Sequence, residues 1–219
     1  MIKHLSLLAL LGATSSMAAT ITFQAGVNGY DHLGLDIRQN QGSNNGQEIL
    51  TGYQSGTNNV HDIRGLLSFS LASIPAGSII DSITLTLVSN GSQSGTIAGV
   101  GSVNLHEVRP NGVASNNFTE TGTTWANWGN AGVGTPWTAL GGDYVSTALT
   151  TATLSGPGAD ATKLEAGETA TFTTSTDFVA AAQAAFNAGL PLELIMIAPT
   201  AEANTAASNF FRFRSEDFV

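Results

Sequence analysis

The chain has 219 residues, of which 11% are charged and 25 are glycine, and its formal net charge is −9 at pH 7. Seven Lys and Arg residues cannot neutralise the run of phosphates that gives nucleic-acid binding its affinity, so the composition argues against a nucleic-acid partner. An acidic surface favours solubility and, outside the cell, the attraction of divalent cations.

The first 18 residues are predicted to be a signal peptide. Lys3 precedes an apolar run over residues 5–11, and Ser16 and Ala18 have the small side chains and the spacing of a cleavage site after Ala18. The run is too short to span a bilayer, and no second apolar run of about 18 residues follows. We therefore expect a secreted protein without a transmembrane segment; an amphipathic N-terminal helix is the alternative.

Residues 19–219 are expected to form a single domain. The sequence has no cysteine, so this exported chain must be stabilised by burial rather than by disulfides. About 200 residues bury roughly 70% of the surface of the unfolded chain, which is enough for one sandwich or barrel. No repeat of fixed period and no linker-like tract divides the sequence.

The first strands are expected at residues 21–24, 34–38 and 48–53, where short apolar stretches alternate with Thr, Gly and Asn. The clearest alternation follows, because every second residue from Ile63 to Leu71 is apolar or glycine. Residues 74–77 have the sequence of a tight turn, and alternation resumes from Ile83 to Leu87. We predict an antiparallel hairpin with one face buried and the other in water.

Later strands are expected at 103–108, 143–148, 169–174, 192–198 and 209–213. A helix is expected from Phe178 to Asn187, capped by Thr176 or Asp177, ended by Gly189 and lying over one end of the core. Residues 111–140 lack a period and contain all three tryptophans, which indicates one long loop. The sequence therefore predicts an all-β fold, a two-sheet antiparallel β-sandwich of jelly-roll type, with one short helix in the C-terminal third.

Several short motifs occur in a characteristic order. The strongest is the run from Arg64 to Gly77, an arginine–leucine–phenylalanine strand and its turn. The other motifs are Phe23–Gly26, Tyr30-Asp31, Asp36-Ile37, Leu50–Gly52, Glu120, Thr124-Trp125 and Phe211–Glu216. This order resembles the DNRLRE domain, the disaggregatase-related family of secreted β-sandwich modules of bacteria and archaea.

The resemblance implies a non-catalytic module of a secreted or cell-surface bacterial protein. Members of the family are attached to polysaccharide lyases and glycosidases or belong to large surface proteins, and some recognise alginate. The expected partner is therefore a polysaccharide or a cell-surface glycan. A structural or adhesion domain without a sugar site is the alternative. The chain ends at Val219, just past the last predicted strand, which leaves room for a sorting anchor or further domains beyond it.

A sugar site combines an aromatic ring, whose face contacts the C–H groups of the sugar, with a few side-chain hydrogen bonds. The alternative for each aromatic residue is plain packing in the core. Arg212 and Arg214 alternate with two phenylalanines and predict a positive strip for the carboxylate of a uronate. The candidate carbohydrate-binding residues are Trp128, Trp137, Tyr53, Asp143, Arg212 and Arg214.

Hard oxygen ligands near the N-terminus predict a structural calcium ion, although their spacing is not that of an EF-hand and simple turns are the alternative. The candidate ligands are Asn28, Asp31, Asp36 and Glu48. Arg64 opens a predicted core strand, and we expect its guanidinium to bind Glu216 or Glu120 in bidentate fashion rather than a ligand.

The chain is not expected to be an enzyme, because no motif supplies a nucleophile or a matched acid and base. Glu120 and Asp143 are the residues that a glycosidase or lyase, the third hypothesis, would use. The histidines at 32, 61 and 106 lack the spacing of a metal site.

Overall fold

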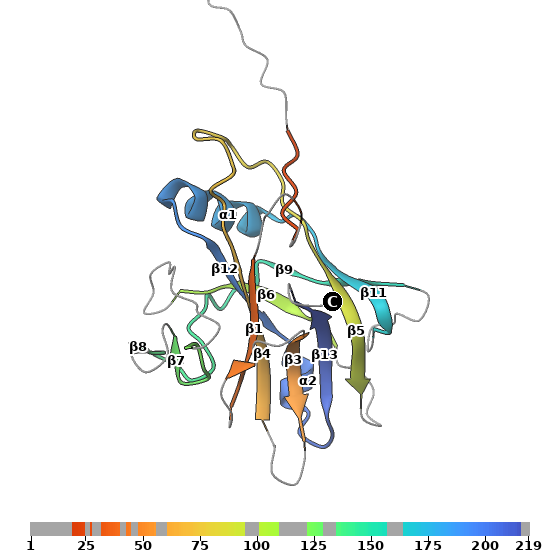
Figure 1. The fold of residues 1–219 in the computed structure, drawn as a ribbon. Coiled ribbons are helices and arrows are strands. Elements are labelled where there is room, and N and C mark those ends of the chain that lie inside the picture. The colour runs from red at the N-terminus through yellow and green to blue at the C-terminus, as the bar shows by residue number, and fades with distance from the viewer. Residues whose placement is uncertain are drawn as a thin grey trace, which may run out of the picture.

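The computed structural model of the chain describes residues 19–24, 27, 32–39, 43–44, 48–55, 61–94, 101–109, 122–128, 135–156 and 164–215. These residues form an antiparallel β-sandwich with two helices, so the predicted all-β class is confirmed (Figure 1). Neither helix of the described residues has the length and apolar character that a membrane crossing requires.

The strands run from Leu33 to Arg214, and both helices of the described residues lie after residue 175. The strands are β1 (Leu33–Arg38), β2 (Ser43–Asn44), β3 (Glu48–Gln54), β4 (His61–Phe69), β5 (Leu85–Ser94), β6 (Asn104–Glu107), β7 (Asn127–Trp128), β8 (Thr135–Pro136), β9 (Thr150–Thr151), β10 (Thr153–Ser155), β11 (Ala166–Phe172), β12 (Leu192–Ile197) and β13 (Asn209–Arg214). The helices are α1 (Thr176–Ala188) and α2 (Pro199–Ala203). The predicted strands at 21–24 and 143–148 are wrong; the second segment runs beside β6 but forms one isolated bridge, Val108 with Tyr144.

The sandwich has two layers that meet at β4. Layer one is β10-β11-β5-β13-β3, and layer two is β4-β12-β6-β9, with β1 along the other edge of β4. The same edge of β4 pairs first with β3, at residues 61–63, and then with β12, at residues 65–69. A Cβ atom at Gly65 would lie 2.5 Å from Met196 Cε and 2.8 Å from Ile49 Cγ2, so a larger residue where the layers separate would have to displace these side chains.

The opposite margin of the sandwich is closed by one short segment. Residues 150–151 pair with β6 in layer two, and residues 153–155 pair with β11 in layer one. Between them, the Ala152 N–H donates to the Val103 carbonyl at 2.9 Å. The backbone therefore crosses from one layer to the other within this single short stretch.

The predicted hairpin of the segments around 63–71 and 83–87 is wrong. β4 pairs with β1, β3 and β12, whereas β5 pairs with β11 and β13 in the other layer. The tight turn does form, because Ser78 N–H donates to the Pro75 carbonyl at 3.1 Å and Gly77 has φ of 80°. It lies within a connection that carries the chain from layer two to layer one.

The main core lies between the layers. Side chains from layer one face side chains from layer two, and all are buried. The residues that layer one contributes include Ile49, Leu87, Phe172, Phe211 and Phe213, and those of layer two include Leu67, Leu105, Leu194 and Met196. Burial on this scale contributes about 25 cal/mol for each Å² of apolar surface removed from water, which is the force that holds the layers together.

A second core covers the outer side of layer two. Leu66, Ile37 and Ile195 point away from the main core and are covered by Trp125 and Trp137 of the long loop. The expectation that one face of the strand at 63–71 is in water is therefore wrong for the described part of β4. Both faces are buried because the aperiodic loop packs on the second one.

Helix α1 covers one end of the main core, as predicted. Phe178, Ala182 and Ala185 are buried on its inner face. The N-cap is Ser175, whose side chain accepts the Phe178 N–H at 3.0 Å. The predicted caps, Thr176 and Asp177, are one and two residues later. Gly189 ends it in the left-handed conformation, with φ of 66°.

Candidate functional site

The six predicted sugar-binding residues lie in three separate regions. Trp128 and Trp137 belong to the loop that covers the outer side of layer two, and Asp143 follows this loop. Tyr53 is 3% exposed on β3. Arg212 and Arg214 are on β13 in layer one. The structure therefore does not bring the aromatic candidates and the arginines into one site.

The tryptophans serve mainly to pack the long loop. Trp137 is 5% exposed and its ring N–H donates to the Thr124 carbonyl at 2.9 Å, so this ring presents no face for stacking. Trp128 is half-buried, and its ring centroid lies 6.4 Å from that of Trp137. Its ring N–H has no hydrogen-bond partner within the described residues. Of the predicted platforms, only Trp128 keeps an exposed part.

Asp143 and Tyr53 also have structural contacts. The Asp143 carboxylate accepts the backbone N–H groups of Thr138 and Ala139 at 2.7 and 2.8 Å, which fixes the turn after Trp137. The ring of Tyr53 is buried and offers no face to a sugar. The prediction of these two residues as ligand contacts therefore loses its geometric basis.

A row of charged residues lies on the outer face of layer one and continues onto β1. Arg38 pairs with Ile63, Ile63 with Gly52, and Gly52 with Phe210. Residues directly opposite each other share a side of the sheet, and so does every second residue along a strand. This register places five charged residues on one face, which we term the charged face: Asp36, Arg38, Glu48, Arg212 and Arg214.

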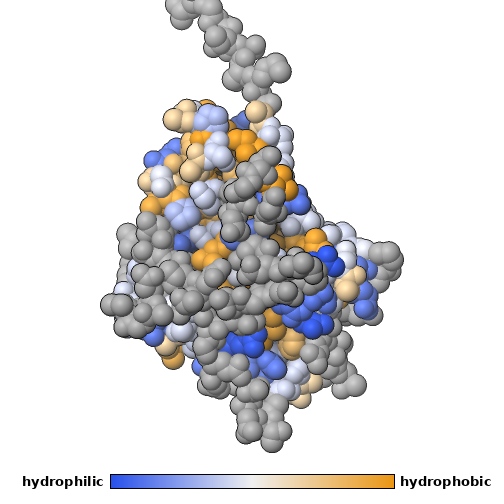
Figure 2. Space-filling model, in the orientation of Figure 1, coloured by the Kyte–Doolittle hydropathy of each residue, from blue (hydrophilic) through white to orange (hydrophobic). Residues whose placement is uncertain are grey.

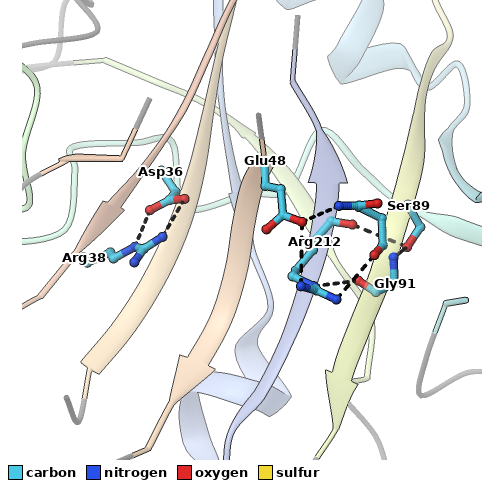
Figure 3. A network of polar contacts seen from close by, with 7 residues as sticks. Asp36, Arg38, Glu48, Ser89, Gly91 and Arg212 are labelled. Carbon is cyan, nitrogen blue, oxygen red and sulfur yellow. Dashed lines mark hydrogen bonds and ion pairs between the residues drawn. The ribbon is translucent and has the colours of Figure 1, made fainter. Parts of the chain in front are cut away.

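Two groups of polar contacts stand on the charged face, side by side across β1, β4, β3, β13 and β5 (Figure 3). In the first, Arg38 Nε donates to Asp36 Oδ1 at 2.6 Å and Arg38 Nη2 approaches Oδ2 at 3.3 Å. Asp36 is fully buried and the Arg38 side chain is 18% exposed. Ligands can therefore reach this group only through Arg38.

The second group is more exposed. Arg212 Nη1 lies 3.7 Å from Glu48 Oε1, and its Nη2 and Nε donate to the carbonyls of Asn90 and Gly91, each at 3.4 Å. The Asn90 amide donates to the Glu48 carboxylate. The side chains of Arg212 and Glu48 are 36% and 27% exposed. A guanidinium, a carboxylate and an amide are thus held together at a surface that a ligand can reach.

Apolar side chains separate the two groups. Leu50, Ile63 and Phe210 share the charged face and form a small cluster, with exposures of 6%, 0% and 4%. Because these three side chains are buried, the accessible part of the face is formed by its polar residues. The positive strip predicted from Arg212 is therefore a mixed-charge group, neutralised in part by Glu48.

Arg64 forms the expected bidentate ion pair, but with a different partner. Its Nε and Nη2 donate to the two carboxylate oxygens of Glu202 at 3.0 and 2.8 Å, and Nη1 donates to the Gly141 carbonyl at 3.0 Å. The guanidinium also lies over the rings of Trp125 and Tyr144, at 5.1 and 5.5 Å. Glu216 and Glu120, the predicted partners, lie outside the described residues.

The electrostatics near Arg64 follow from burial. Burial works against the charge of Arg64, but the hydrogen bonds and attraction of Glu202 outweigh it and raise the pKa of the guanidinium. Burial raises the pKa of Asp62, and the charge of Glu202 adds to this. For His106, burial lowers the pKa more than the hydrogen bond to the Val145 carbonyl, at 2.9 Å, raises it. The contacts of this cluster tie β4, α2 and the long loop together, which is a structural role.

The predicted calcium ligands are only partly within the described residues. Asn28 and Asp31 lie outside them, and Asp36 and Glu48 bind Arg38 and Asn90. Within the described ranges, no three His, Asp or Glu side chains are grouped as a metal site would require. The calcium ion stays a prediction.

Sequence reasoning missed Glu202 and Asn90. Glu202 is on α2, a five-residue helix without an amphipathic pattern, and its partner Arg64 is 138 residues away. Asn90 lies within the register irregularity between β13 and β5, where Phe211 pairs with Ser92 and Phe213 pairs with Ser89. The charges of Glu48 and Arg212 could have indicated the pairing of β3 with β13. Each residue lies on the polar side of an alternating strand, and these polar sides share one face of the sheet if the two strands are neighbours.

Taken together, the fold and the site define a β-sandwich protein with fixed ion pairs along one sheet face. No protein-family model matches the chain, and no curated protein matches it. The resemblance to the disaggregatase-related family stays a prediction.

Proposed function

We propose that the protein is a non-catalytic module that binds polysaccharide through the charged face. The observation that supports this most directly is the group formed by Glu48, Asn90 and Arg212, which is anchored on three neighbouring strands and partly exposed. In this proposal Trp128 is a peripheral contact at most, because it lies on the loop that covers layer two.

The chemistry of this group suits sugar hydroxyls. Each hydroxyl both donates and accepts a hydrogen bond, while a carboxylate accepts, a guanidinium donates and an amide does both. Adjacent hydroxyls of a pyranose therefore match a carboxylate beside a guanidinium. Because Arg212 is held by two backbone carbonyls, little side-chain entropy is lost when a ligand binds.

The expected place of action is outside the cell, at a bacterial surface or in the surrounding medium. The support for this is the N-terminal segment with its basic residue, its short apolar run and its small residues before Ala19. The alternative is a structural or adhesion module without a sugar site, and a binding experiment separates the two.

The test is a calorimetric titration of the domain with soluble polysaccharides, both neutral and uronate-containing. Each titration is performed with and without a chelator. The variant Arg212→Gln is expected to weaken binding at least tenfold, because it removes the donors that flank Glu48. Arg109→Gln is the matched control: it removes an arginine that also binds a carboxylate, Glu107, at 2.8 Å, but on layer two. Binding should be unchanged in this control.

Two outcomes would contradict the proposal. If no polysaccharide binds the unmodified domain, the structural alternative is preferred. If polysaccharide binds and Arg212→Gln has no more effect than Arg109→Gln, the sugar site is elsewhere on the molecule. Release of reducing ends or unsaturated products during the titration would instead favour the hydrolase or lyase hypothesis.

A further inference from the structure

A groove lies at the end of the sandwich that carries α1, away from the charged face. One wall is the turn over residues 70–77, and the other is the C-terminal end of α1 with the residues that follow it, up to Pro191. Its volume is about 520 Å³. Sites for small molecules in proteins commonly have roughly 300–1,000 Å³.

Hydrogen bonds hold both walls in place. In the turn, Ile74 N–H donates to the Leu71 carbonyl at 3.0 Å. Gln183 of α1 crosses to the residues after the turn: its side-chain oxygen accepts the Ile80 N–H at 2.7 Å, and its amide N–H donates to the Ser78 carbonyl at 3.3 Å. The groove is therefore formed before any ligand arrives, which lowers the entropic cost of binding.

The lining combines apolar surface with uncharged polar groups. The apolar contributors are Leu71, Ile74, Phe186, Leu190 and Pro191. Ser70 and Asn187 contribute a hydroxyl and an amide, and no residue of the lining is charged. The Gln183 amide donates to Asn187 Oδ1 at 2.8 Å, which orients the Asn187 side chain. Figure 2 shows apolar and polar surface interleaved at this end of the molecule.

We propose that this groove is a second binding site, for an uncharged ring that carries hydroxyl groups, such as one neutral sugar unit. The apolar wall matches the C–H face of a pyranose, and the amide and hydroxyl match its O–H groups. A carboxylate or phosphate is disfavoured, because the lining has no counter-charge and the protein has a net charge of −9. None of the lining residues belongs to the charged face, so this site does not depend on the function proposed above.

The site is tested by nuclear magnetic resonance of the ¹⁵N-labelled protein titrated with methyl glucoside, methyl galactoside and methyl mannoside, up to about 10 mM since small ligands bind weakly. At least one sugar is expected to shift the amide signals of residues 70–77 and 186–190 and to leave those of residues 36–38 and 48–54 unchanged. Galacturonic acid, which has the same ring with a carboxylate, should give smaller shifts.

Ala76→Trp fills the groove from an exposed position and should abolish the shifts, and Ala206→Trp, also exposed but outside the lining, should not. Should Ala76→Trp fail to fold, Ala72→Trp, another exposed lining position, decides instead. The proposal is overturned if none of the three neutral sugars shifts the groove signals, or if the shifts persist in the filled variants. Arg212→Gln should leave the groove signals unaffected, so failure of the charged-face proposal would be seen separately.

Discussion

Two buried histidines, His61 and His106, have a pKa below the ordinary value of 6.5. For His61, burial is the main cause, and the nearby charge of Arg38 adds to it. Neither ring nitrogen of His61 has a hydrogen-bond partner among the residues described. The neutral ring is therefore the form that fits the folded protein.

The free energy of unfolding is expected to fall as the pH is lowered from about 7 toward 5. The unfolded chain binds a proton at each histidine with a pKa near 6.5, while the folded chain binds it only at lower pH. Each histidine therefore makes its full contribution to the free energy of unfolding above about pH 6.5. Below that pH the contribution decreases, by up to about 1.4 kcal/mol per pH unit for each histidine. Urea unfolding at a series of pH values measures this slope.

His61→Gln and His106→Gln should each make the slope smaller, because glutamine does not titrate in this range. The unmodified protein is the comparison. A variant whose slope equals that of the unmodified protein would contradict the assignment to that buried ring.

For single residues, the sequence predicted the face of the sheet on which a side chain lies better than it predicted the residue that the side chain binds. The alternation of Arg212 and Arg214 with two phenylalanines places both arginines on the outer side of their strand, where the structure has them. The partner Glu48 is on β3, far earlier in the chain, and no local pattern connects the two. Burial drives alternation locally, whereas pairing depends on which strands become neighbours.

Among the elements, the contact between β4 and α2 depends on one ion pair. The side chains of Arg64 and Glu202 are 13% and 12% exposed, so removing one partner leaves a charge in a poorly hydrated place. Arg64→Gln is therefore expected to lower the free energy of unfolding by about 3 kcal/mol. Chemical denaturation at pH 7 measures the loss.

The matched change is Glu107→Gln, because the charge that it leaves unpaired is Arg109, whose side chain is 42% exposed, and because this ion pair has the same 2.8 Å length. An exposed pair contributes about 1 kcal/mol or less. Equal losses in the two variants would mean that the Arg64 pair is no more than a surface contact.

The period of two predicts the strand at 63–71 but not the strands that pair with it. A tight turn between two alternating segments favours a hairpin, and the turn is present. However, the connection is long enough to carry the chain to the other layer, and the segments pair with strands more distant in sequence. Turn chemistry fixes a local bend and leaves the choice of layer open.

The sequence contained evidence that the strands of layer two are covered on both faces, although the alternation of residues 63–71 did not show it. β12 reads LELIMI, an almost continuous apolar run, and Leu66 and Leu67 are adjacent on β4. Such runs are typical of strands that are covered on both sides. An aperiodic stretch rich in tryptophan was the segment available to cover the second side.

For the molecule as a whole, the main core is shared by both layers, so the layers are expected to unfold together. The three tryptophans of the chain lie on the loop that covers layer two, whereas far-ultraviolet circular dichroism reports strands of both layers. Unfolding curves from tryptophan fluorescence and circular dichroism should therefore coincide. A fluorescence transition at lower denaturant would show that the loop and its cover detach first.

The crossing of the backbone near Ala152 has a mechanical consequence. A force that pulls the two layers apart meets a covalent chain at one margin and a strand common to both layers at the other. At the first margin the backbone still joins the layers after the two residue pairs of β9 with β6 have opened. A domain exposed to flowing liquid and tethered at one end would resist shear in this way without any cross-link between side chains.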